Sequence, residues 1–185
     1  VGKKAEIAAI TEAAMRGEIA DYADSLRRRV ALLAGVPLAA LDEIYTQRLR
    51  LNPGAEALLA AARERGLKTL LVSGGFTFFT DRLQARLGLD YTRSNTLDVH
   101  DGHLTGRLVG PIVDGVEKRA MLERTCAALG VGTAAAIAIG DGSNDLPMMR
   151  VAGLSVAYHA KPAVQAEAML AINNGGLDAL LQHLH

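Results

Sequence analysis

The spacing of apolar residues changes along the chain. From Lys4 to about Leu49 the apolar positions recur with a helical period, which glycines and a proline interrupt near residues 17 and 35–37. From residue 54 onward, short apolar runs typical of buried strands alternate with helical stretches. The runs are 68–72, 135–139 and 154–157. This alternation predicts an α/β fold, with a parallel sheet and helices on both faces.

The first fifty residues show no strand pattern. We therefore predict a helical cap region over residues 1–50 and an α/β core over residues 51–185, with the cap packed over one end of the sheet. Within the core, Asn95–Val99 and His103–Leu108 flank Asp101-Gly102, which predicts a hairpin with a two-residue turn.

Composition narrows the class of protein. The 185 residues are 50% hydrophobic, enough for one domain with a sizeable core. Lys plus Arg and Asp plus Glu number 20 each, so charge gives no reason to expect nucleic acid or an acidic membrane as partner. No apolar run is long enough to span a membrane, and the single cysteine, Cys126, fits a reducing cytoplasm. We expect a cytoplasmic protein, and a homodimer is compatible with the sequence.

Two carboxylates follow the predicted strand that ends at Ile139. Asp141 and Asp145 stand in the run Gly140-Asp-Gly-Ser-Asn-Asp145, at the carboxyl end of a strand, where open α/β sheets bind ligands. Oxygen ligands of this kind suit Mg²⁺. The alternative is an ordinary turn aspartate followed by a helix cap within residues 143–145.

A second junction follows the strand that ends at Val72. Ser73 supplies a hydroxyl, and Gly74 and Gly75 let backbone N–H groups approach an anion at the start of a helix. The alternative is a simple turn with Ser73 as helix cap. Lys118 is predicted in the first turn of a helix, where the helix dipole disfavours a positive charge. This unfavourable position indicates a functional cation, such as one that faces a phosphate. A surface lysine remains the alternative.

Arg29 is a candidate ligand for an acidic group. It shares one helix face with Tyr22 and Leu26, whereas Arg27 and Arg28 point toward solvent. A guanidinium on the covered face requires a carboxylate, which either the substrate or a structural ion pair would supply.

These junctions, in this order, resemble the motifs of the haloacid-dehalogenase superfamily, and more closely those of its phosphoserine phosphatases. Val72–Phe76 resembles the second motif, Lys118 the third and Gly140–Asp145 the fourth. The likeness continues in runs such as Asp101–Gly106 and Ala160–Pro162, so it covers nearly the whole chain. It implies a Rossmann-like core with a helical cap.

The resemblance also implies roles for the residues of the core. Asp141 would bind Mg²⁺. Asp145 would either hold the metal site in place without contacting the ion or contact the ion through water. Ser73 and the Gly74 N–H would grip the transferring phosphoryl group, whose charge Lys118 would neutralise.

The remaining candidates would bind the substrate. Gly75 and Asn144 would lie beside the phosphate, and Arg29 would hold the substrate carboxylate. Met15 and Tyr22 would line the pocket, with Tyr22 standing where a phenylalanine is usual in the family.

The family's first motif, Asp-x-Asp-x-Thr, is absent from the sequence. It carries the nucleophilic aspartate, which we therefore expect upstream of residue 1, on a strand between those that end at Val72 and Ile139. The implied activity is Mg²⁺-dependent hydrolysis of O-phospho-L-serine through an aspartyl phosphate, in serine biosynthesis. The alternatives are phosphatase or phosphotransferase chemistry on another small phosphomonoester, or a non-catalytic fragment or binding protein.

Overall fold

Two three-stranded sheets form the centre of the part of the chain that the structure, a computed structural model, describes (residues 6, 8–10 and 21–184). The first sheet has the order β1-β2-β3, with β1 Leu70–Phe76, β2 Tyr91–His100 and β3 His103–Val109. The second has the order β4-β5-β6, with β4 Ile137–Gly140, β5 Leu154–Tyr158 and β6 Leu170–Ile172. All pairs are parallel except β2–β3, which is antiparallel.

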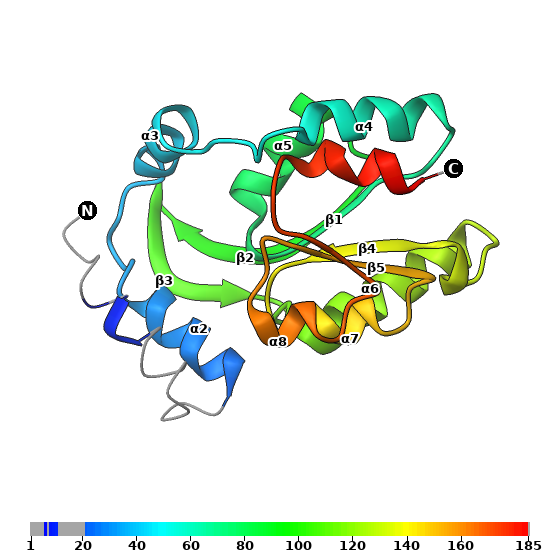
Figure 1. Cartoon of the computed structure of the whole chain (residues 1–185). Helices are drawn as coiled ribbons and strands as arrows, with labels where there is room; N and C mark the ends of the chain where they lie inside the picture. Colours follow the sequence, from blue (N-terminus) through cyan, green and yellow to red (C-terminus); the bar gives the residue numbers. More distant parts are fainter. Residues whose placement is uncertain (1–5, 7, 11–20, 185) are drawn as a thin grey trace.

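Helices cover both faces of the sheets, as predicted. Figure 1 shows α4, α5 and the C-terminal 3-10 helix η2 on one side, and α6, α7 and α8 on the other. Their bounds are α4 Ala55–Glu64, α5 Thr77–Leu87, η2 Leu177–His183, α6 Gly115–Ala128, α7 Leu146–Met149 and α8 Pro162–Gln165. In the residues that the structure describes, no helix combines the length and apolarity needed to cross a membrane.

The predicted hairpin is confirmed. His100 pairs with His103, and the turn residues Asp101 and Gly102 have φ of 48° and 73°. Two successive positive φ angles are what a tight hairpin turn requires, and Asp-Gly supplies them at low cost.

The strands differ from prediction at two junctions. β1 continues to Phe76 instead of ending at Val72, and its pairing with β2 shifts there, from Val72 opposite Arg93 to Phe76 opposite Asn95. Four positions of β1 thus face two of β2, which is a bulge over residues 73–75. In addition, β4 begins only at Ile137, because residues 133–135 form a 3-10 turn, η1 (Thr133–Ala135), instead of strand.

The described helices of the predicted cap region, α2 (Tyr22–Ala31) and α3 (Ala39–Gln47), pack on β2 and β3. Leu26 and Val30 of α2 are 3% and 1% exposed and share an apolar cluster with Leu97 and Leu104. Burying such side chains contributes about 1.5–3 kcal/mol each, which fixes α2 against the first sheet. The domain boundary near residue 50 stays a prediction.

Among the described residues, β1 pairs only with β2, and β4 pairs only with β5. Each residue of β1 is partly buried and none is fully buried, although the strand begins with the apolar run Leu70–Val72. A strand placed between β1 and β4 would complete the burial of both. That expected strand stays a prediction.

Candidate functional site at the carboxyl ends of β1 and β4

The bulge in β1 releases the backbone of residues 73–75 from regular pairing. The Gly75 N–H donates to Ser73 Oγ at 3.0 Å. No acceptor among the described residues takes the Ser73 O–H, so it remains available to donate to a ligand. Ser73 does not cap the following helix, since Phe76 holds the N-cap position of α5. The alternative of a simple capping serine is therefore wrong.

Lys118 is buried, with 6% of its surface exposed, and is not a surface lysine. It lies in the first turn of α6, whose N-cap Asp114 accepts the Glu117 N–H at 2.8 Å. The Lys118 Nζ donates to Asp145 Oδ1 at 2.6 Å. A buried ammonium group requires such a partner, because burial without one is very costly.

Asp145 ties the end of β4 to α6. Its second oxygen, Oδ2, accepts the backbone N–H groups of Asp141 at 3.0 Å and Gly142 at 3.1 Å. Although Asp145 precedes α7, it makes no side-chain capping bond to that helix. Gly140 leaves the necessary space, since a Cβ there would collide with the Asp145 side chain. Asp145 thus occupies the N-cap position of α7, as the alternative had it, but its side chain bonds Lys118 and two loop N–H groups instead of the helix.

Asp141 is exposed, and its carboxylate accepts no hydrogen bond from the residues that the structure describes. Mg²⁺ is commonly held by one or two carboxylates together with water and substrate phosphate, so an unengaged carboxylate at this position fits the ion. Across the described ranges, no group of three His, Cys, Asp or Glu residues comes together. Asn144 is half-buried beside this loop, with its Oδ1 close to Gly142.

Tyr22 of α2 brings the helical region to the same place. Its hydroxyl lies directly against Gly74, where a Cβ would collide with it. Burial raises the pKa of Tyr22; the Arg29 charge opposes this, and the charges of Asp114 and Asp145 add to it. The Tyr22 hydroxyl is therefore affected both by a charge on α2, that of Arg29, and by the charges of Asp114 and Asp145 in the core.

Arg29 is half-buried, whereas Arg27 and Arg28 are exposed, as predicted. The Arg29 Nε donates to the Ser25 carbonyl at 3.3 Å, and no carboxylate of the described residues forms an ion pair with it. Its guanidinium therefore keeps donors for a ligand. Met15, the other predicted pocket residue, lies outside the described residues.

Sequence reasoning missed Asn95, which is 2% exposed. Its Nδ2 donates to the Gly74 carbonyl at 2.9 Å, and its Oδ1 accepts the Val113 N–H at 2.8 Å. Asparagine is depleted in strands, and its place as the first residue of the predicted strand 95–99 was the only available signal.

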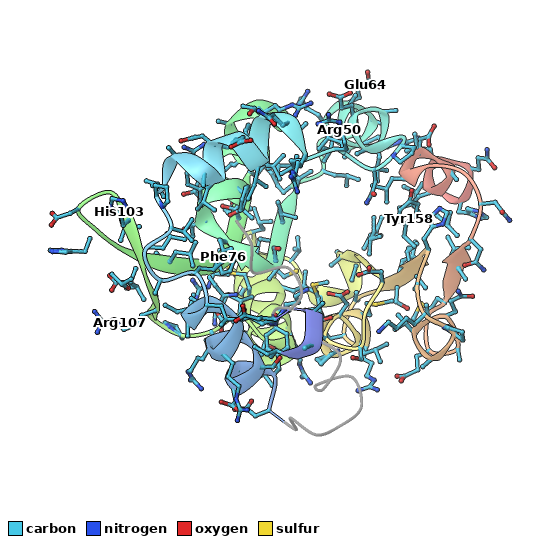
Figure 2. The ribbon with its side chains drawn as sticks, turned by 90° about the vertical axis from the view of Figure 1, so that its left-hand side faces the viewer. Arg50, Glu64, Phe76, His103, Arg107 and Tyr158 are labelled. Carbon is cyan, nitrogen blue, oxygen red and sulfur yellow. The ribbon has the colours of Figure 1, made fainter. Side chains whose placement is uncertain are left out.

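Hydrogen bonds therefore link each of the two strand ends to α6. They pass from Gly74 through Asn95 to the start of α6, and from Lys118 through Asp145 to the Asp141 backbone. Figure 2 shows Phe76, at the end of the bulge, in the middle of the molecule, with His103 and Arg107 on the outlying hairpin. The structure brings together the predicted core residues 73–75, 118, 141, 144 and 145, with Tyr22 above them.

A family model for haloacid dehalogenase-like hydrolases matches residues 3–150. The chain therefore belongs to this family of hydrolases.

Within the family, the chain is similar to phosphoserine phosphatases. The enzyme of that name from Polaromonas sp. is 66% identical over 185 residues, which cover 98% of this chain and 78% of the relative. A solved phosphoserine phosphatase that holds an analogue of the phospho-aspartyl intermediate is 34% identical, with a TM-score of 0.91, and is matched over 100% of this chain and 87% of its own. A solved family hydrolase from Salmonella enterica is 40% identical with a TM-score of 0.93; the match covers 97% of this chain but only 62% of that one.

Proposed function

We propose that the protein is a Mg²⁺-dependent phosphatase that hydrolyses O-phospho-L-serine to L-serine and phosphate. The observation that carries the proposal is that hydrogen bonds tie both Gly74, next to Ser73, and the Asp141 backbone to α6, the helix of Lys118. The names of the relatives support the choice of substrate. The reaction would belong to serine biosynthesis, in the cytoplasm.

The phosphoryl group would be held between the two junctions. The Ser73 hydroxyl and the Gly74 N–H donate to its oxygens, with Gly75 keeping the backbone open. The Lys118 ammonium, fixed by Asp145, faces its charge. Phosphoryl transfer depends mainly on positioning and electrostatic stabilisation, and these groups provide both without reorganising.

Asp141 would hold Mg²⁺ directly, because its carboxylate is exposed and unengaged. Asp145 would hold the metal site in place without contacting the ion, or contact it through water, because its oxygens already accept bonds from Lys118 and two backbone N–H groups. When bound, Mg²⁺ neutralises the charge that spreads over the phosphoryl oxygens.

The nucleophile would be an aspartate upstream of residue 1, on a strand between β1 and β4. In the described part of the site, Asp114 and Asp145 are already hydrogen-bonded, and Asp141 is assigned to the metal. In the described part of the chain, β1 and β4 each pair with one strand only, which supports this placement. Asn144 would contact the phosphate or this nucleophile.

The helical region would select the substrate. Arg29 would bind the serine carboxylate, and Tyr22, together with Met15, would line the pocket. The half-buried Arg29 guanidinium, unpaired among the described residues, supports this role.

The test is phosphate release from O-phospho-L-serine by the full-length protein, with Mg²⁺ and with a chelator. We expect turnover with Mg²⁺ only, and its loss in Asp141→Asn. Turnover that survives this substitution would overturn the metal assignment. A panel of phosphomonoesters without a carboxylate distinguishes phosphoserine from other small substrates, and absence of all turnover favours a binding protein.

A further inference from the structure

We infer that Asn95 is a positioning residue for phosphoryl transfer, which holds the segment Ser73–Gly75 in register with the helix that carries Lys118. The inference rests on the proposed function. Asn95 lies on β2 opposite Phe76, at the end of the bulge, and is 2% exposed. A buried amide at such a place must have hydrogen-bond partners, and the partners reveal what it does.

Asn95 satisfies two backbone groups that the fold leaves without regular partners. The bulge detaches Gly74 from the β1–β2 ladder, and the Asn95 Nδ2 bonds its carbonyl at 2.9 Å. Val113 precedes α6 and is 0% exposed, and its N–H donates to the Asn95 Oδ1 at 2.8 Å. One planar side chain thereby sets the distance between two backbone segments.

That distance matters because the two segments carry the opposite halves of the phosphate site. Val113 directly precedes Asp114, the N-cap of α6, whose carbonyl accepts the Lys118 N–H at 3.0 Å. A displacement of Val113 would move the start of α6 relative to Gly74. Among the described residues, Asn95 is the one side chain that hydrogen-bonds both segments.

Loss of either bond should slow the chemical step more than it weakens substrate binding. Asn95 contacts backbone and not the substrate, so its removal misplaces the phosphoryl-binding groups. A misplacement of about 1 Å costs about 100-fold in rate. We therefore expect kcat to fall by about that factor, with a much smaller change in KM.

The variant Asn95→Asp separates positioning from packing because its effect depends on pH. An ionised carboxylate accepts the Val113 N–H but repels the Gly74 carbonyl. A neutral carboxyl group donates to that carbonyl and accepts from Val113, as the amide does. Burial favours the neutral form, so the kcat of Asn95→Asp relative to wild type should recover as the pH falls.

The experiment measures kcat and KM for O-phospho-L-serine from acid to neutral pH in the full-length protein, with circular dichroism to confirm folding. The matched control is Asn173→Asp, at an exposed asparagine that donates to Gln165 Oε1 at 3.1 Å. Its ratio to wild type should stay near one at every pH. Asn95→Leu removes both bonds without adding charge, and should lose kcat with no recovery in acid.

A ratio for Asn95→Asp that stays far below one at every pH, acid pH included, would overturn the inference. So would a folded Asn95→Leu variant that turns over at the wild-type rate, whatever the aspartate variant does. A wild-type protein without phosphatase activity would instead overturn the proposed function.

Discussion

Replacing Lys118 by methionine perturbs the buried ion pair at the centre of the site. The side chains of Lys118 and Asp145 are 8% and 7% exposed, and Nζ lies 2.6 Å from Oδ1. Removing one member of a buried pair costs about 3–5 kcal/mol, because the other charge stays buried without its partner. Asp145 keeps two backbone donors, so we expect the lower end, about 3 kcal/mol, or roughly 6–12 °C in Tm.

Urea unfolding of the full-length protein, followed by circular dichroism, measures this loss. Lys68→Met is the matched control, because Lys68 forms an equally direct pair with Asp90 at 2.8 Å on the surface. Exposed pairs contribute little, so this control should unfold at nearly the wild-type urea concentration. Adding Asp145→Asn to Lys118→Met should restore part of the loss, since it removes the buried charge. Equal stability of the two single lysine variants would refute the reasoning.

Three further predictions concern the substrate, the bulge and pH. Arg29→Ala should raise KM for O-phospho-L-serine in steady-state kinetics roughly 10- to 150-fold, because one charge-assisted hydrogen bond to the substrate is lost. Phosphomonoesters that lack the carboxylate should show little change in this variant, and the control Arg28→Ala should show little change with O-phospho-L-serine. Gly74→Ala should weaken the binding of inorganic phosphate, measured by calorimetry or as inhibition, because the new Cβ meets the Tyr22 hydroxyl. Adding Tyr22→Phe removes that hydroxyl and should restore phosphate binding. A double variant that binds phosphate no better than Gly74→Ala would contradict the contact. Burial alone would raise the pKa of Glu117, but hydrogen bonds from two arginines outweigh burial and lower the pKa below its ordinary 4.5. Ionised Glu117 therefore stabilises the fold above that pH, and this stabilisation is lost as the pH falls through the pKa of the folded state. Glu117→Gln should therefore be less stable at neutral pH, with a difference in unfolding free energy that shrinks on acidification and not on alkalinisation.

The sequence predicted the elements whose determinants are local. The Asp101-Gly102 turn needs only two residues that tolerate positive φ, and it was found where expected. The alternation of apolar runs with helices likewise predicted the layers. The orientation of Arg29, away from Arg27 and Arg28, followed from helix geometry alone.

Features that depend on contacts across the fold could not be predicted in the same way. The continuation of β1 through Ser73–Gly75 depends on pairing with β2, which the local Gly-Gly signal conceals. The burial of Lys118 depends on Asp145, 27 residues further along the chain. Asn95 was missed because its partners, Gly74 and Val113, are 21 and 18 residues away.

The central claim is that the junctions after β1 and β4 act on one phosphoryl group. A double-mutant cycle with Ser73→Ala and Asp141→Asn, measured as kcat for phosphate release from O-phospho-L-serine, tests it directly. Residues that act as a unit are strongly non-additive, so the double variant should be about as slow as the slower single variant. Two losses that simply multiply would show that the junctions work independently, and would contradict the account.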